Sequence, residues 1–206
     1  MTVDATRPPV WFRLPPGFHD LSPSDRAPLD EAAQALESPG ARQELARIMD
    51  HLDRFTDRHV VHTSIGLHPE GPVGAASSVF ALSLRPAEHP NARLGVARAA
   101  LAIARSPLWN DFSGQVLPLP SGLPCSLAVG TISLPGTGQE LFQARLVTTH
   151  PSGTHLVFLD LTSTAVQYAE AYGDIIEAIA HTVVFSDPTP APAAAAPASR
   201  VLEVLL

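Results

Sequence analysis

The feature that most constrains this chain is the point where its patterned sequence stops. Apolar residues recur with helix or strand spacing as far as Phe185, and residues 187–197 then read DPTPAPAAAAP. A run of proline and alanine cannot build a core and behaves as a semi-rigid, extended spacer. We therefore expect a disordered N-terminus over residues 1–9, a folded domain over residues 10–186 and a linker over residues 187–198.

The residues beyond this linker form a short apolar peptide, 199–206, which reads SRVLEVLL. Such a peptide cannot fold alone, and in water it is a liability unless it docks on something. On a helix Val201, Leu202, Leu205 and Leu206 would share one face, and on a strand Leu202, Val204 and Leu206 would do so. We expect the docking residues to be Arg200, Val201, Leu202, Val204, Leu205 and Leu206. The receiving surface could be the same domain, a second copy or another protein, and the alternative is a frayed chain end.

Length, hydropathy and charge narrow the class of protein. With 206 residues, 45% of them hydrophobic, the chain can form one domain with a substantial core. No apolar run approaches the ~20 residues that span a bilayer. The first residues, with Asp4 and two prolines, do not resemble a secretory signal, so we expect a cytoplasmic protein without membrane insertion. A net charge of −7 argues against a general nucleic-acid binder.

The types of reactive residue exclude several chemistries. All 13 basic residues are arginine, a usage typical of GC-rich genomes, so lysine nucleophiles, Schiff bases and lysine-containing phosphate loops are excluded. Cys125 is the single cysteine, which excludes an internal disulfide and a thiolate metal site, and its position at a strand start favours a small buried thiol. The Gly-x-Ser-x-Gly motif of hydrolases does not occur. We therefore assign no catalytic residue.

Histidine is frequent, with nine copies, but no ligand set for a metal is evident. His59 and His62 are three residues apart, so on a strand they would face opposite sides. His150 and His155 flank an HPSG turn and could meet across a hairpin, with Asp160 as the nearest acid. A zinc site needs three or four ligands. We interpret the two turn histidines as a polar pair and expect neither a metal nor a cofactor.

Hydrophobic spacing predicts the order of helices and strands. Within residues 11–21 we expect a short strand and a bend, and we expect further strands over residues 59–67, 78–84, 125–134, 140–149 and 155–162. Helices are expected over residues 23–37, from Ser38 to Phe55, from the N-cap Asn91 to Arg105, and from a capping box at Thr164 and Gln167 to Val183. Short turns make the last three strands antiparallel neighbours.

Four finer expectations concern faces and loops. Residues 68–76 are expected to form a long hairpin loop, and residues 106–114, SPLWNDFSG, an irregular segment. Val61, Ile65 and Leu67 are expected to share one strand face. In the helix after Asn91, the packing stripe is expected to comprise Leu94, Ala97, Leu101 and Ala104, with Arg93, Arg98 and Arg105 beside it.

This layout predicts an α+β fold, a single mainly antiparallel sheet of about six strands with helices packed on its faces. The opening LPPGF, the two-part sheet around a middle helix and the closing Tyr-rich helix that ends in AHTVVF resemble the Mog1/PsbP-like fold, and small actinobacterial proteins of the LpqN type are similar. The resemblance implies a binding or assembly factor without a shared catalytic site, and it transfers no functional residue. Because the first residues resemble neither a signal peptide nor a lipid-accepting cysteine motif, we expect the chain to differ in this respect from the lipoprotein members.

The leading hypothesis is a non-enzymatic cytoplasmic interaction or assembly module. It would dock on a larger complex, such as a secretion system or a protein shell, through the C-terminal peptide. Trp11 and Trp109 are further candidate partner-binding residues, unless these aromatics cap the sheet ends. One alternative is a small-molecule-binding protein or enzyme with a cleft between sheet and helices. Another is a self-assembling structural protein, a homo-oligomer that uses the tail.

Overall fold

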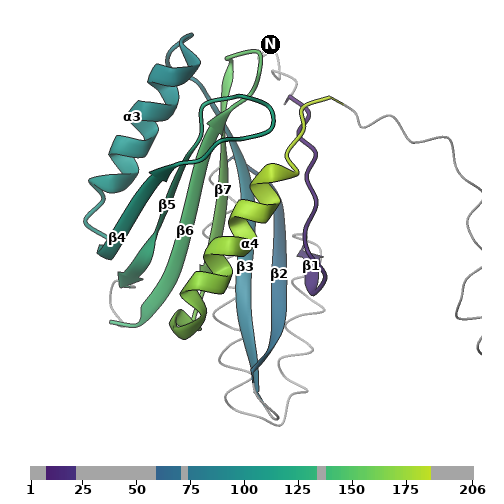
Figure 1. The fold of residues 1–206 in the computed structure, drawn as a ribbon, viewed down its shortest axis with the longest axis vertical. Helices are drawn as coiled ribbons and strands as arrows, with labels where there is room; N and C mark the ends of the chain where they lie inside the picture. Colours follow the sequence, from purple (N-terminus) through teal and green to yellow (C-terminus); the bar gives the residue numbers. More distant parts are fainter. Residues whose placement is uncertain (1–7, 22–58, 71–73, 134–137, 187–206) are drawn as a thin grey trace, which may run out of the picture.

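The computed structural model describes residues 8–21, 59–70, 74–133 and 138–186, without the side chains of residues 67–70 and 74–76. In these ranges the chain is α+β, with one seven-stranded sheet and two α-helices (Figure 1). The elements are β1 (Phe18–Leu21), β2 (Val60–Glu70), β3 (Gly74–Pro86), α3 (Ala92–Ala104), β4 (Trp109–Val116), β5 (Ser126–Ser133), β6 (Glu140–Thr149), β7 (His155–Ser163), the 3-10 turn η2 (Val166–Tyr168) and α4 (Ala169–His181). The helices expected within residues 23–55 and the tail residues 187–206 lie outside the described residues.

The sheet has the strand order β1-β2-β3-β7-β6-β5-β4, and every neighbouring pair is antiparallel. The strands β4 to β7 follow one another as a meander, because the short connections between them return the chain beside itself. The strand β7 then pairs with β3, which joins the meander to the β1–β3 part of the sheet. The predicted α+β fold with one antiparallel sheet is confirmed, with seven strands rather than about six.

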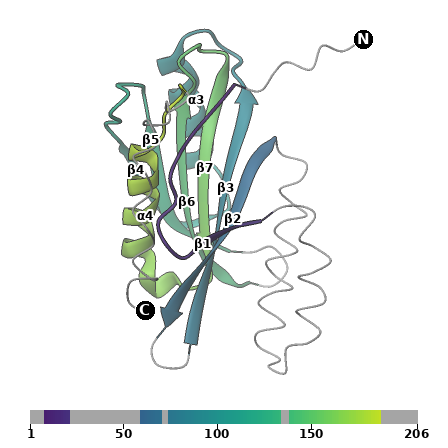
Figure 2. The same ribbon diagram turned by 90° about the vertical axis from the view of Figure 1, so that its right-hand side faces the viewer.

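Alternation along the strands separates the two faces of the sheet. Phe80, Leu82 and Leu84 of β3 share one face, as predicted. This face carries the main core, to which alternate residues of β7 and β6 also contribute. Helix α4 covers this face with its buried residues Tyr172, Ile176 and Ile179, and the Phe142 and Tyr172 rings are 5.5 Å apart. Figure 2 shows α4 on one side of the sheet. Its helical spacing predicted this packing, because an amphipathic helix directs one apolar stripe at a sheet.

Helix α3 packs on the opposite face. The Asn91 side chain caps it, accepting a 3.1 Å hydrogen bond from the Leu94 N–H, as predicted. The predicted packing stripe is wrong, because Leu94 is 41% and Leu101 49% exposed. Instead Val96 is buried, and a Cβ added at Gly95 would lie 3.5 Å from the Leu156 side chain. The helix α3 carries apolar residues on most of its circumference, so spacing alone does not select the buried side. Its small residues face the sheet because they allow a close approach, and the leucines then face outward.

Four local expectations need correction. The segment expected to be irregular contains β4, which pairs through its backbone with β5 although most of its side chains are exposed. The strands β2 and β3 extend to Glu70 and from Gly74, so the expected loop over residues 68–76 is mostly strand. A bulge after Val60 breaks the predicted face and leaves Val61 36% exposed. The last helix starts at Ala169, after η2, so Thr164 is not its N-cap.

The start and the end of the described domain are hydrogen-bonded to each other. Trp11 and Val184 exchange two backbone hydrogen bonds of 2.9 Å, and the Arg13 N–H donates to Thr182 Oγ1 at 2.8 Å. The Phe185 ring lies edge-on to His150 at 5.2 Å, which brings the chain after α4 to the β6–β7 turn. The chain therefore leaves the described fold at the end of the sheet where this turn lies.

Candidate functional site

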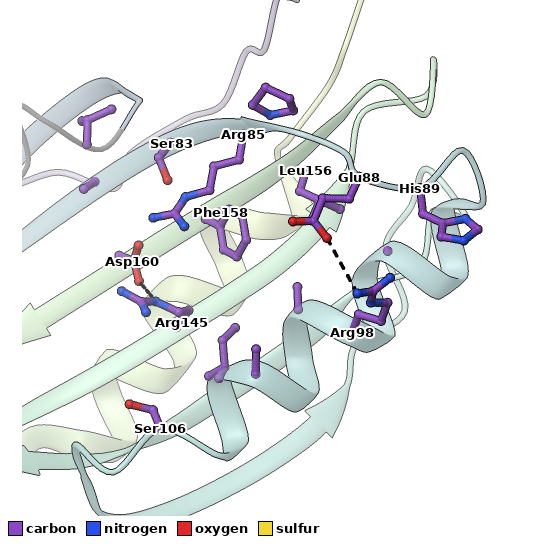
Figure 3. A pocket seen from close by; sticks show the side chains of 17 residues that line it. Ser83, Arg85, Glu88, His89, Arg98, Ser106, Arg145, Leu156, Phe158 and Asp160 are labelled. Carbon is purple, nitrogen blue, oxygen red and sulfur yellow. Dashed lines mark hydrogen bonds and ion pairs between the residues drawn. The ribbon is translucent and has the colours of Figure 1, made fainter.

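A cavity of about 510 Å³ lies between the inner flank of α3 and the adjacent strands (Figure 3). The sheet contributes alternate residues that point to the α3 face. The lining residues are Val60, Ala81, Ser83, Arg85, Pro86, Glu88, His89, Gly95, Arg98, Ala99, Ala102, Ile103, Ser106, Arg145, Leu156, Phe158 and Asp160. A volume of this size is typical of small-ligand sites.

The deepest charged group of the cavity is a carboxylate paired with an arginine. Asp160 on β7 lies directly across from Arg145 on β6, and the Arg145 Nε donates a hydrogen bond to Asp160 Oδ1. Gln143 Nε2 also donates to this oxygen at 3.5 Å. Asp160 is only 7% exposed, and a buried carboxylate needs such partners because burial removes its hydration. Toward the other described residues Arg145 donates through Nε, so its two Nη groups can serve another acceptor.

A second arginine, Arg85 on β3, lies over an aromatic ring. Its guanidinium carbon is 5.4 Å from the centroid of the Phe158 ring on β7, a distance at which a cation is attracted to a ring face. Within the described residues Arg85 has no carboxylate at ion-pair distance. Figure 3 shows its guanidinium extended across the cavity toward the Asp160 side, near Ser83.

The third arginine lies at the rim. Arg98 of α3 and Glu88 approach to 3.8 Å, with side chains that are 60% and 86% exposed. An exposed pair of this kind contributes little free energy. Among the described residues, the cavity therefore carries three guanidinium groups against two carboxylates, and no described carboxylate balances the charge of Arg85.

The remaining wall of the cavity is apolar. Leu156 and Phe158 of β7 face Ala99, Ala102 and Ile103 of α3 across it. An apolar wall beside a few directed polar groups is the usual composition of a ligand pocket. Guanidinium groups bind carboxylate or phosphate oxygens with pairs of N–H donors. The arrangement can therefore hold an anion that carries an apolar body.

The structure places the two predicted tryptophans in different surroundings. Trp109 Nε1 donates to the Ile103 carbonyl oxygen at 2.8 Å, and its ring is 5.5 Å from Phe112, so Trp109 links the end of α3 to β4. Trp11 pairs through its backbone with Val184. Their role in binding a partner stays a prediction. The other predicted partner-binding residues, 200–206, lie outside the described residues.

The histidines expected at the HPSG turn do come together. The His150 N–H donates to the His155 carbonyl oxygen at 2.9 Å, and burial, with His155 nearby, lowers the pKa of His150. On β2, His62 lies 3.4 Å from Asp20 and edge-on to Phe12. Burial lowers the pKa of His62, and Asp20 partly offsets this. In the described ranges no three His, Cys, Asp or Glu side chains are grouped as a metal site.

Cys125 lies in the core, 3% exposed, as its position predicted. Burial raises the pKa of its thiol to about 12. A thiol that stays protonated at neutral pH is a poor nucleophile, because the thiolate is the reactive form.

The sequence did not bring the cavity residues together: it pointed to Arg98 only as a neighbour of the helix stripe and to Asp160 only as the acid nearest two histidines. A weak signal was present, because Arg85, Arg145 and Asp160 each follow a buried core residue directly along their strands. Alternate polar positions of an antiparallel strand usually face solvent, so this pattern alone does not indicate a site.

Comparison with known proteins supports the fold. No family model and no curated protein matches the chain. The crystal structure of LpqN, a Mycobacterium tuberculosis protein involved in cell envelope biogenesis, superposes with a TM-score of 0.50 and 16% identity, over 88% of this chain and 85% of that one. A Pseudomonas aeruginosa protein of unknown function, PA94, described as a putative regulator, superposes with a TM-score of 0.38 and 16% sequence identity. The match covers 56% of this chain and 79% of that one. The chain shares the LpqN fold, which confirms the predicted resemblance.

One further finding concerns membranes. Among the described residues, none of the helices combines the length and apolarity that crossing a bilayer requires.

Proposed function

We propose that this protein is a non-enzymatic binding module that holds an amphiphilic anion in the cavity between α3 and the sheet. The observation that carries the proposal is Arg85, a cation without an ion-pair partner in the described structure, placed over Phe158 beside an apolar wall. A ligand carboxylate or phosphate would supply the missing charge.

The ligand has two parts in this proposal. Its anionic group lies between Arg85 and the Nη groups of Arg145, where both can donate. Its apolar body lies along Leu156 and Phe158 on one side and Ala102 on the other. Burial of an apolar body contributes roughly 25 cal/mol for each Å² removed from water, so the apolar wall adds affinity and the arginines add selectivity for charge.

Binding is favoured over catalysis by the state of the acidic groups. Asp160 is engaged by Arg145, and Glu88 lies against Arg98, so each carboxylate of the cavity already has a cation. A general base needs to lie within hydrogen-bond reach of the proton that it removes. His89 is the described histidine of the cavity lining, and its Nδ1 has no hydrogen-bond partner there, so it does not activate a serine through this atom.

Calorimetric titration with decanoate, and with decanol as an uncharged probe of the same length, tests the proposal. We expect decanoate to bind, and Arg85→Gln to weaken it about tenfold, which corresponds to the ~1.4 kcal/mol of one charge-assisted contact. Arg93→Gln is the matched control, since Arg93 is an exposed arginine of α3 outside the cavity lining. Equal binding of decanol and decanoate, or an Arg85→Gln variant with unchanged affinity, would contradict the proposal.

A second candidate function rests on the spacer and the apolar peptide that follows it. In this proposal the domain is a cytoplasmic assembly module that attaches to a larger protein complex through residues 199–206. The linker would hold the domain away from the attachment point and raise the local concentration of the peptide. Co-precipitation with the full chain and with the Leu202→Asp, Leu205→Asp variant tests it, and a complex that survives both changes would exclude the peptide.

A further inference from the structure

The strand β4 forms an open edge of the sheet. It pairs with β5 on one side, and the described structure contains no strand on its other side. Residues 110–116 are exposed along its whole length. An uncovered edge strand presents free backbone donors and acceptors, and proteins usually protect it with charges, proline or a bulge. Residues 112–116 of β4, FSGQV, contain no charge and no proline, and the bulge lies before them.

The backbone pattern shows which groups of β4 point outward. The Leu117 N–H donates to the Cys125 carbonyl oxygen at 3.2 Å, so this pair faces β5. Because inward and outward residues alternate in an antiparallel pair, Phe112, Gly114 and Val116 direct their N–H and C=O groups to the open edge.

The side chains of these three residues share the α3 face and form an apolar strip. Val116 is 83% and Phe112 39% exposed, and the Phe112 ring lies over Gly114, where an added Cβ would meet it at 3.0 Å. The other face of the same segment carries Ser113 and Gln115. A strand added to this edge would therefore find an apolar neighbour on one face and a polar neighbour on the other.

We propose that residues 199–206 of the same chain add to β4 as an eighth, antiparallel strand. On a strand, Leu202, Val204 and Leu206 share one face. Antiparallel pairing of Leu202 with Val116, of Val204 with Gly114 and of Leu206 with Phe112 places this face on the apolar strip. Glu203 then lies beside Gln115 on the polar face.

The exit point of the domain allows this pairing. Phe185 contacts His150, which follows β6, and Val147 of β6 is aligned through Ser126 of β5 with Val116. The exit and the Val116 end of β4 therefore lie at the same end of the sheet. The strand β6, which ends beside the exit, is two strand spacings of about 4.8 Å each from β4. The twelve linker residues, 187–198, span up to about 37 Å at ~3.1 Å per residue.

The direction of the chain agrees with this placement. A segment that arrives at the Val116 end and continues toward Trp109 runs opposite to β4, as antiparallel pairing requires. Strand addition of this kind gains backbone hydrogen bonds from the edge and selectivity from alternate side chains. The inference does not depend on a ligand in the cavity, and an external partner of the peptide would have to displace it from the edge.

Paired cysteines in the full-length chain test the register. Gln115→Cys with Glu203→Cys places two side chains at a non-hydrogen-bonded pair, where Cβ atoms approach closely enough for a disulfide. Under mild oxidation we expect most of the monomer to become internally cross-linked. Gln115→Cys with Val204→Cys is the control, since Val204 would lie on the other face, and native Cys125 is buried.

Amide hydrogen exchange gives a second readout that requires no cross-link. In the full-length protein we expect the amides of Phe112, Gly114 and Val116 to exchange at least tenfold more slowly than in a Leu202→Asp, Leu206→Asp variant. Leu205→Asp, on the opposite face, is the control and should retain the protection. Equal exchange in wild type and double variant, or cross-links found only between two molecules, would overturn the proposal. The proposal would also be overturned if another protein captured the peptide while the amides of the β4 edge in this chain stayed unprotected.

Discussion

Replacement of Asp160 by asparagine separates two effects of the Arg145–Asp160 pair. Asparagine has nearly the same shape as aspartate, so the packing of β7 is retained while the negative charge is lost. The variant leaves the Arg145 guanidinium without its counter-charge at the inner wall of the cavity. We therefore predict that one substitution lowers the stability of the domain and raises its affinity for an anion.

The cost in stability follows from the burial of the two side chains. Removal of one partner of a fully buried ion pair costs about 3–5 kcal/mol. The Arg145 side chain is 34% exposed and can regain some hydration, so we expect roughly 1–3 kcal/mol. A change of 1 kcal/mol shifts the Tm of a domain of this size by about 2–4 °C. Thermal unfolding followed by circular dichroism should therefore show a Tm lowered by roughly 2–12 °C.

The gain in affinity follows from Coulomb's law. A ligand anion about 6 Å from the Asp160 carboxylate is repelled by about 3 kcal/mol at an effective dielectric constant of ~20, and by about 0.7 kcal/mol in water. For this partly open site we take the repulsion to be about 1.4 kcal/mol, so its removal should raise the affinity for the anion about tenfold. Titration with decanoate measures it, and Glu88→Gln at the exposed rim is the matched control, with an expected gain of about twofold or less. A folded Asp160→Asn variant that binds decanoate no more tightly than wild type would refute the placement of the anion beside Arg145.

Three further predictions concern the domain itself. Burial lowers the pKa of His62 below 6.5, so the unfolded chain takes up a proton more readily than the folded one. The contribution of His62 to stability should therefore be complete above about pH 7 and be lost as the pH falls through 6.5. In measurements of Tm against pH, His62→Gln should flatten this slope. The Cys125 thiol, with its pKa raised to about 12, should resist iodoacetamide at pH 8 in the native protein and react once guanidinium unfolds it, and rapid native labelling would contradict its burial. Gly130→Ala would set a Cβ 2.0 Å from the Asp111 carbonyl oxygen and should lower the free energy of unfolding by about 2 kcal/mol or more. In α4, a Cβ at Gly173 meets nothing within 4 Å, so Gly173→Ala should raise the free energy of unfolding by about 0.5–1 kcal/mol. Urea unfolding measures both changes.

The strands with clean alternation could be predicted from the sequence. In β3, β6 and β7 one face is fully buried, so Phe80, Leu82 and Leu84 recur every second residue and their period is unmistakable. The amphipathic α4 and the Asn91 cap of α3 were predicted for the same reason, since each is encoded within one short segment.

The parts that escaped prediction depend on contacts between distant segments. The strand β4 has almost no buried side chain, so backbone pairing with β5 defines it and leaves no hydrophobic pattern. The orientation of α3 depends on the fit of Gly95 to Leu156, which spacing cannot show. The cavity forms because Arg85, Arg145 and Asp160 come from three strands that only the sheet order brings together.

The pairing of β3 with β7 has a consequence for folding kinetics. The β4–β7 meander is local in sequence, whereas Leu82 pairs with Leu159, 77 positions later. Pairings between distant segments form slowly because a long loop must first close. The cavity spans this junction, with Arg85 on one side and Phe158 and Asp160 on the other. A ligand bound there joins the two parts of the sheet across their slowest contact, so occupancy should lengthen the lifetime of the native state as well as raise its equilibrium stability.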